Sequence, residues 1–401
     1  MPEPLHGIVV ADLTQNVAGP FCTQILGDMG ADVIKVERPG AGDDARAWAP
    51  PFWGAESAAF LALNRNKRSL ALDIKSPAGL ETLRRLVTRA DVLVQSLRAG
   101  VVEGMGFGYE QVRVMNPRLV YCSITAYGPR GPLKDLPGYD PLMQAYAGLM
   151  SVNGHPGQPP ARVGTSIVDM GTGMWAAIGI LGALRERDRT GHGAQVTTAL
   201  FDTALMWVCY HLMGYLGSGT IPQPQGSGTS MIVPYEAFPT QDGYLMIAAG
   251  RDALFVKACE ALGLGELAQD PRFADNPSRV KHRAILFDRI ADVTRREGSG
   301  ALQERLRRVG VPCSQILTID RVVAEPQTGA SGMLVAAEHP RLPDYRGVGL
   351  PIMWEGKRPG IARVSPLVGE HTAVILGWLG YGPDEIRRLA DQGAVQLGGG
   401  S

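Results

Sequence analysis

The sequence predicts an α/β protein in which a large domain with a doubly wound sheet is joined to a smaller α+β domain. Two observations lead to this prediction. Apolar segments typical of buried strands alternate with helical segments through the first half of the chain, which is the pattern of parallel βαβ units. Between residues 216 and 234 the composition shifts to Gly, Pro, Ser and Gln, which indicates a loop or linker. A chain of 401 residues, 45% of them hydrophobic, can fill more than one domain of ordinary size.

The first half of the chain is a series of strands separated by helices. We expect strands over 7–13, 31–37, 69–74, 90–96 and 118–128, with helices over 18–29 and 77–89. A further strand is expected within residues 161–170, with Asp169 at its end. It is followed by a helix over 173–187, a break at 190–193 and a strand over 194–200. This succession predicts a Rossmann-like domain, in which helices cover both faces of a mainly parallel sheet.

The second half of the chain predicts a smaller α+β domain. A hairpin is expected over 236–249, and helices with one charged face over 252–262 and 279–308. Residues 329–366 are rich in loops, and two helices are expected over 371–380 and 383–391. We therefore assign 1–215 and 330–401 to a discontinuous large domain, 216–234 to a linker, and 235–329 to the small domain.

Composition and charge exclude several classes of partner. The 39 basic and 39 acidic residues give no net charge, so nothing draws nucleic acid or an anionic membrane to the whole protein. The five cysteines are scattered and form no Cys-x-x-Cys pair, which favours the reducing cytoplasm and no metal site. The apolar stretch over 174–184 is too short to span a bilayer, and the amino terminus lacks the features of a signal peptide.

Asp169 is the most informative single residue, and local sequence leaves two interpretations open. Asp is favoured as a helix N-cap, and by itself this interpretation has the larger weight. Alternatively, the positive end of the helix dipole would stabilise an ionised carboxylate, while Gly171 and Gly173 would leave room for a bulky acyl group. A carboxylate in that setting can act as a nucleophile.

Other motifs are weaker. The turn after the first strand, TQNVAGP, has a single Gly and does not match a dinucleotide-binding loop, and Asp169 ahead of GTGMWA would repel a pyrophosphate. The seven histidines are dispersed, and no serine-hydrolase elbow or phosphate loop is present. Basic residues follow or precede strands near one rim of the sheet, where they are either solvated or available to the phosphates of a ligand. They are Arg38, Lys67, Arg68, Lys75 and Arg98.

Nearly the whole chain resembles the family III CoA-transferases. The resemblance rests on the order and spacing of segments such as VVADLTQNVAGPFCTQILGDMGADVIKVERPGAGDDAR, LNRNKRSLALDIKSPAG, GYDPLMQAYAGLMSVNG, RVGTSIVDMGTGMWAAIG and SPLVGEHTAVILGWLG. It implies an interlocked, ring-like homodimer in which a large and a small domain of each chain thread the other chain. It also implies that Asp169 is the nucleophile, that acyl-CoA is a substrate, and that no cofactor is permanently bound.

Matching the family motifs residue by residue implies roles for further positions. Asn16, Val17 and Ala18 would form a wall of the acyl pocket, with Tyr139, Asp140 and Gly171 in support. Gly226 and Gly228 fall where the family has a glycine-rich loop, although this chain has fewer glycines there. The implied CoA contacts are Arg38, Leu72, Lys75, Ser96, Leu97, Arg98 and Met105.

We therefore expect a CoA-transferase that moves CoA from an acyl-CoA to a free carboxylic acid. Val17 replaces the Gln of formyl-CoA transferase, and Asp140 replaces its Glu, so a dicarboxylate pair including succinyl-CoA is favoured. One alternative is a racemase of the α-methylacyl-CoA type, but Tyr139 stands where such enzymes have His, and Tyr is a poor base at neutral pH. Another alternative is a non-catalytic acyl-CoA-binding protein.

Overall fold

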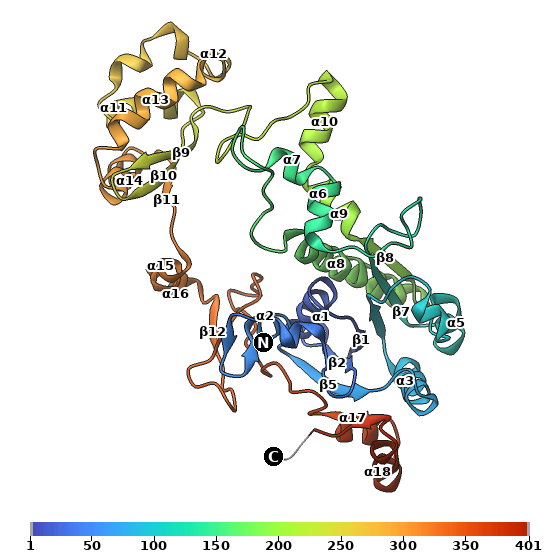
Figure 1. Ribbon diagram of the computed structural model, residues 1–401. Coiled ribbons are helices and arrows are strands. Elements are labelled where there is room, and N and C mark those ends of the chain that lie inside the picture. Colours follow the sequence, from blue (N-terminus) through green and yellow to red (C-terminus); the bar gives the residue numbers. More distant parts are fainter. Residues whose placement is uncertain (1–2, 399–401) are drawn as a thin grey trace. The chain divides into compact units, whose positions relative to one another are not determined.

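The computed structural model describes residues 3–398, which divide into two compact units (Figure 1). The first unit contains the chain up to Ala147, Val163–Cys209, and the chain from Pro326 onward. The second contains Gly148–Arg162 and Tyr210–Glu325. Residues 148–162, which the sequence analysis placed in the large domain, are thus grouped with the second unit, and the whole of the expected linker, 216–234, belongs to that unit as well.

The first unit is built on a seven-stranded sheet with the order β14-β5-β2-β1-β6-β7-β8. Six strands are parallel: β1 (Val9–Leu13), β2 (Asp32–Glu37), β5 (Lys67–Leu72), β6 (Val92–Gln95), β7 (Val120–Thr125) and β8 (Gln195–Ala199). The short strand β14 (Val395–Gln396) pairs antiparallel with β5. The six parallel strands confirm those predicted near the same residues. Their order reverses between β1 and β6, and in open α/β sheets ligands bind at such a point.

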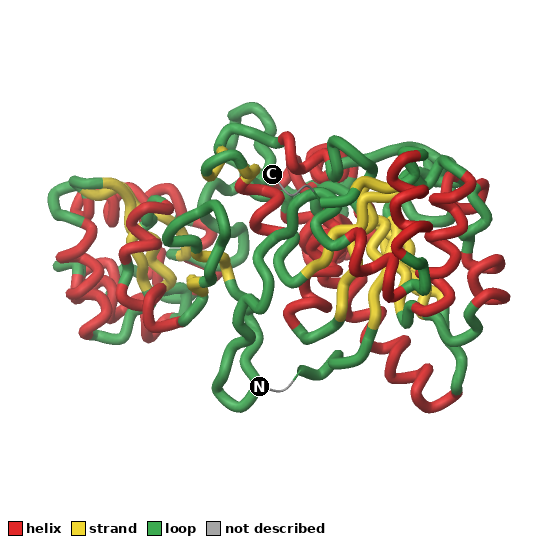
Figure 2. The backbone as a smooth tube through the Cα atoms, turned by 90° about the horizontal axis from the view of Figure 1, so that it is seen from below, coloured by secondary structure: helices red, strands yellow, loops and turns green. Residues whose placement is uncertain are grey.

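Helices cover both faces of this sheet, and most of its strand residues are buried. On one face lie α1 (Ala18–Asp28) and α8 (Ile167–Thr190), which pack against each other. The other face carries α3 (Pro77–Arg89), α5 (Tyr109–Met115), α17 (Thr372–Trp378) and α18 (Pro383–Asp391), whose buried side chains form one hydrophobic cluster with alternate strand residues. In Figure 2 the strands of this sheet lie between these layers of helix.

The strand predicted to end at Asp169 is absent, and that prediction was wrong. Residues 161–166 form no ladder, and α8 begins at Ile167, six residues before the expected start at Gly173. With 24 residues, α8 is long and apolar enough to cross a membrane by length and composition, but half of its most apolar window is buried inside the protein. Its burial against α1 and the sheet marks it as a core helix.

The second unit has its own core. A three-stranded antiparallel sheet, β9 (Tyr235–Thr240), β10 (Gly243–Ala248) and β11 (Cys313–Gln315), packs on α11 (Asp252–Ala261), α13 (Arg283–Thr294) and α14 (Ser299–Arg308). The hairpin and α11 confirm the prediction. The single helical stretch predicted over 279–308 is instead divided among α12 (Asn276–Lys281), α13 and α14, because His282 and the Gly298 turn interrupt it.

The remaining elements are short and mostly lie at the surface. They are η1 (Asp44–Ala47), β3 (Phe52–Trp53), β4 (Glu56–Ser57), α2 (Ala58–Leu63), α4 (Val101–Gly104), α6 (Asp140–Tyr146), α7 (Leu149–Val152), α9 (Leu200–Trp207), α10 (Cys209–Ser218), η2 (Gly265–Ala268), η3 (Pro271–Phe273), α15 (Ile319–Ala324), α16 (Pro326–Ser331), β12 (Leu334–Ala336) and β13 (Arg346–Val348).

The close packing of α1 on α8 depends on Gly173, and replacing it should be costly. A Cβ at this position would lie 2.5 Å from the Ala18 carbonyl oxygen, which is main chain and cannot rotate away. We expect Gly173→Ala to lower the free energy of unfolding by about 1–3 kcal/mol, as overpacking does. Gly182→Ala in the same helix is the matched control, because nothing lies within 4 Å of that Cβ.

In Gly182→Ala we expect stability to stay unchanged or to rise by about 0.5–1 kcal/mol through helix propensity. Denaturant unfolding of both variants measures the difference. Equal stability of the two variants would contradict the assigned packing of the helices.

Candidate active site

A pocket of about 400 Å³ opens at the carboxyl ends of β1, β6 and β7, where the strand order of the sheet reverses. Its lining comes from four places in the sequence: the turn 15–19 after β1, residues 96–101 after β6, residues 124–139 around and after β7, and Asp169 on α8. Asp44, Trp48 and Leu200 complete it. The fold therefore gathers residues more than 150 positions apart at the place where the topology predicts a ligand.

Asp169 lies in the first turn of α8, but it does not cap the helix. The N-cap position is Ser166, whose side chain makes no capping hydrogen bond. The acceptor is instead the buried carboxylate of Asp140, to which the main-chain N–H groups of Val168 and Asp169 donate at 2.8 and 3.3 Å. Within residues 3–398 no group donates a hydrogen bond to the Asp169 carboxylate. Asp169 is therefore left free to act on a ligand.

The surroundings of Asp169 make its charged form costly. Burial, and to a lesser extent the negative charge of Asp140, raise the pKa of this carboxyl from 3.8 to about 7. Asp140 keeps its place because Gln144 Nε2 donates to it at 2.6 Å and the start of α8 donates to its other oxygen. A half-buried carboxylate with little stabilisation from donors is a stronger nucleophile than a solvated one.

Hydrogen-bond donors face the same pocket from the start of α1. Val17, Ala18 and Gly19 all line it, and no side chain caps this helix. Within the described part of the chain, their three main-chain N–H groups donate to no protein acceptor. Unpaired amides at a helix start, together with the positive end of its dipole, stabilise negative charge that develops on an oxygen.

Comparison with known proteins identifies the family of the chain. The family model described as CoA-transferase family III matches residues 5–372. The chain belongs to this family. Succinate–glutarate CoA-transferase of Agrobacterium fabrum is 39% identical over 382 residues, covering 94% of this chain and 96% of that protein. Succinyl-CoA:glutarate CoA-transferase of Homo sapiens is 36% identical over 394 residues, covering 98% and 90% respectively.

A solved structure supports the same assignment. The crystal structure of a CAIB/BAIF family protein from Brucella suis is 38% identical, with a TM-score of 0.86, and it covers 94% of this chain and 100% of that one. The prediction of a family III CoA-transferase, an enzyme that transfers CoA between an acyl-CoA and a carboxylate, is confirmed at this level.

Eight of the residues that the family motifs implicate line the pocket. They are Asn16, Val17, Ala18, Ser96, Leu97, Arg98, Tyr139 and Asp169. Asp140 lies behind the pocket wall, where its contacts are with the start of α8. Gly171 and Gly173 do not provide the room expected for an acyl group. A Cβ on Gly171 would meet Trp207 at 2.5 Å, and the space beside Gly173 is filled by α1.

Four of the implied CoA contacts lie outside the pocket lining. Arg38 is exposed and pairs with Asp44, which does line it, so Arg38 lies at the rim. Lys75 is exposed near the end of β5. The side chain of Leu72 is only 1% exposed and belongs to the core, so a ligand cannot reach it. Met105 is half-buried and packs against the same cluster, so only part of its side chain is accessible.

Gly226 and Gly228, which fall where the family has a glycine-rich loop, belong to the second unit. Gly226 adopts a φ of 63°, and a Cβ there would lie 2.8 Å from His155 Nδ1. Gly228 faces Arg283, whose guanidinium donates to Gln225 and Thr229 on either side of it. Both positions are therefore tightly packed within their own unit.

Sequence reasoning missed several residues that line the pocket. Trp48, Lys134, Asp135 and Leu136 all do so, and Lys134 adds a second cation beside Arg98. A signal was available for the loop 134–138, because it follows a central strand and leads into the GYDP motif. Trp48 had no such signal, since it reaches the pocket only through the turn after β2.

The raised pKa of Asp169 predicts a stability effect with a definite sign. Between about pH 4 and pH 7 the unfolded state loses a proton that the folded state keeps, so stability falls as pH rises through this range and stays reduced above pH 7. Asp169→Asn removes this cost. At pH 8 we expect the variant to be more stable than the parent by on the order of 2–4 kcal/mol, and at pH 4 the advantage should be small.

Thermal unfolding at pH 4, 6 and 8 measures this effect. Asp188→Asn, at the exposed end of the same helix, is the control and should change stability by less than about 0.5 kcal/mol at each pH. An Asp169→Asn protein that is no more stable than the parent at pH 8 would mean that the carboxyl is not held in a costly environment.

Proposed function

We propose that this family III enzyme transfers CoA through a covalent intermediate on Asp169, with dicarboxylic acids as acyl groups. The observation that carries the proposal is the placement of a half-buried carboxyl, with its pKa raised to about 7, in one pocket with the unpaired amides at the start of α1. The nucleophile and a site for the developing oxyanion are thus in reach of one thioester.

In the first step the Asp169 carboxylate attacks the thioester carbonyl carbon, and the carbonyl oxygen becomes an oxyanion. The amides of Val17, Ala18 and Gly19 are placed to stabilise that charge. When the C–S bond breaks, CoA leaves as a thiolate and a mixed anhydride remains between the acyl group and Asp169. The negative charge of Asp140 favours this step, because it destabilises the free Asp169 carboxylate relative to the acylated, neutral form.

In the second step the CoA thiolate attacks the Asp169 carbonyl carbon of the anhydride. The first acid then leaves as a carboxylate, and an aspartyl-CoA thioester is formed. The acceptor carboxylate attacks this thioester and the same steps run in reverse, so that each exchange is divided into easier covalent stages. Water would hydrolyse the anhydride, and we infer that the pocket is covered during turnover.

A dicarboxylate pair is favoured by two observations. The relatives from Agrobacterium fabrum and Homo sapiens are named for succinate or succinyl-CoA and glutarate. Arg98 and Lys134 are exposed cations at the mouth of the pocket, where one can hold a CoA phosphate and the other a second carboxylate. The pocket also has no histidine among its described lining residues, which disfavours a racemase that needs an imidazole base.

We also propose that the working form is a homodimer in the cytoplasm. The helices α15 and α16 contain no buried residue, and neither does α10, in which Met213 and Leu216 are 68% and 74% exposed. Apolar surface of this extent is normally covered by another protein surface, and a second copy satisfies it. All five cysteines are free thiols, which fits a reducing compartment.

The transferase mechanism is tested by mixing the protein with succinyl-CoA and isotopically labelled glutarate or other acids. Mass spectrometry should detect labelled acyl-CoA with the parent protein. Asp169→Ala should lower the rate by at least about 10⁴-fold, since the covalent route is lost. Asp202→Ala, an exposed acid on α9, is the control and should keep the parental rate. Racemised or unchanged acyl-CoA in place of labelled product would sink the proposal.

The dimer is tested by light scattering on the purified protein. We expect about twice the chain mass of 42.8 kDa, with no dissociation on dilution. If the dimer is interlocked, tagged and untagged chains purified separately should not exchange until they are unfolded together. A monomeric mass at all concentrations would contradict the proposal.

A further inference from the structure

The turn between β1 and α1 forms one wall of the pocket in an uncommon conformation. Asn16 has a φ of 69°, in the left-handed region that residues other than Gly rarely adopt. The next three residues present the unpaired amides of the proposed oxyanion site. The direction of those amides therefore depends on what holds Asn16 in this conformation, and the inference below rests on the proposed function.

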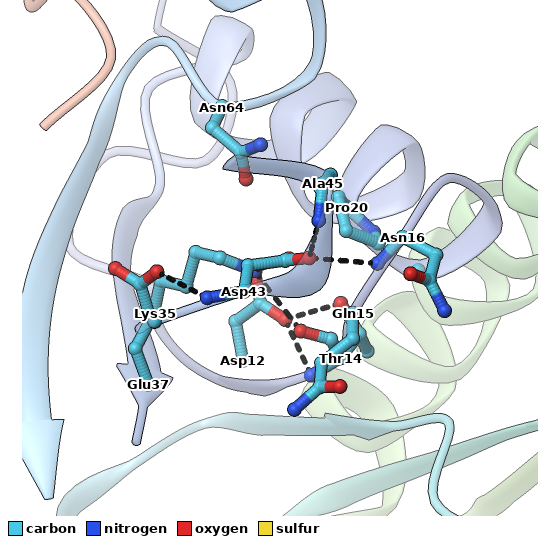
Figure 3. Close-up of polar contacts among 12 residues, drawn as sticks. Asp12, Thr14, Gln15, Asn16, Pro20, Lys35, Glu37, Asp43, Ala45 and Asn64 are labelled. Carbon is cyan, nitrogen blue, oxygen red and sulfur yellow. Dashed lines mark hydrogen bonds and ion pairs between the residues drawn. The ribbon is translucent and has the colours of Figure 1, made fainter. Parts of the chain in front are cut away.

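Asp43 makes the contact that fixes Asn16. Its Oδ1 accepts hydrogen bonds from the N–H groups of Asn16 at 3.1 Å and Ala45 at 2.9 Å. Its Oδ2 lies 2.7 Å from Lys35 Nζ, and the side chains of both partners are fully buried. Figure 3 shows this carboxylate between the lysine and the turn. One charged pair thus connects β2, the loop after it and the wall of the pocket.

The same lysine also holds Thr14, two residues before Asn16. Lys35 Nζ donates to the Thr14 carbonyl oxygen at 3.0 Å. The N–H and hydroxyl of Thr14 both donate to Asp12 Oδ1, at 3.0 and 2.5 Å. Asp12 is held in turn by Lys67, whose Nζ lies 3.3 Å from its Oδ2. Side chains from β1, β2 and β5 therefore fix the main chain of this turn from beneath.

Stability alone does not account for these charges. A buried ion pair is commonly no more stabilising than apolar side chains of similar volume, because both charges lose their hydration. The pairs lie on the face of the sheet covered by α1 and α8, where Val10 and Val33 show that apolar residues also fit. Buried pairs are best explained where they impose one geometry, and here the geometry belongs to the pocket wall.

We propose that Asp43, held in its charged form by Lys35, is a positioning residue for catalysis. It keeps Asn16 in the left-handed conformation, so that the amides of Val17 and Ala18 point at the thioester attacked by Asp169. Asp43 itself does not contact the substrate. Its loss should therefore slow the chemical step while leaving CoA binding close to normal.

The test compares steady-state kinetics of purified, full-length variants with succinyl-CoA and glutarate. Asp43→Ala should lower kcat by about 10- to 100-fold, because a misplaced donor loses most of its effect, with KM for succinyl-CoA changed by less than about threefold. Asp43→Asn keeps the Oδ1 acceptor and should lie between Asp43→Ala and the parent. If circular dichroism shows that Asp43→Ala does not fold, the kinetics of Asp43→Asn alone provide the test.

Asp28→Ala is the matched control, because it also breaks a buried contact made by an aspartate. Asp28 accepts from Arg65 Nε at 3.0 Å and Asn66 Nδ2 at 2.8 Å at the far end of α1, away from the pocket lining. We expect it to lower the melting temperature while keeping kcat within about twofold of the parent. A purely structural role for Asp43 would give the two aspartates the same kinetic behaviour.

A second substitution tests the role of Asn16 directly. Gly adopts a positive φ without strain, so Asn16→Gly should depend less on Asp43 for its conformation. We expect Asn16→Gly to raise kcat more when it is added to Asp43→Ala than when it is added to the parent. Loss of stability alone does not produce such a coupling between the two substitutions. Equal effects in both backgrounds, or an Asp43→Ala enzyme with parental kcat, would overturn the inference. A parent protein without transferase activity would instead count against the proposed function.

Discussion

The start of helix α8 depends on a carboxylate that lies 28 residues earlier in the chain. Asp140 accepts from the amides of Val168 and Asp169, and so fixes where the helix begins, beside its own buried side chain. The same charge stands beside the Asp169 carboxyl and helps to raise its pKa to about 7. One interaction therefore supplies both the geometry of the helix start and the electrostatic environment of the proposed nucleophile.

The sheet provides the second condition. Because the strand order reverses between β1 and β6, the loops after these strands diverge and leave a pocket at their carboxyl ends. The α1 and α8 helices then close one side of it, and Gly173 lets their backbones approach closely. An apolar layer on the opposite face, which includes α17 near the carboxyl end of the chain, supports the strands. The Asp169 carboxyl and the amides of the turn are thus carried by helices that pack against each other and against the sheet.

The structure also changes the interpretation of residues that the sequence singled out. Asp169 was predicted to end a strand, yet it lies in the first turn of a helix. Gly171 and Gly173 were expected to admit an acyl group, but the space beside them is filled by Trp207 and α1. Local sequence was ambiguous here because the apolar residues of TSIV suit a buried strand or a buried helix equally well. The capping acceptor that decides between them comes from α6.

The sequence by itself determined the parallel strands, most of the helices and the family, because these depend on local periodicity and on motifs in a fixed order. It also singled out Asp169, whose role stays a proposal. Only the tertiary structure decided which of the implicated residues meet. It brought Lys134 and Trp48 into the pocket, buried Leu72 in the core, and placed Asp43 beneath Asn16. Those relations depend on strand order and on charge pairing across the sheet, and neither can be deduced from neighbours along the chain.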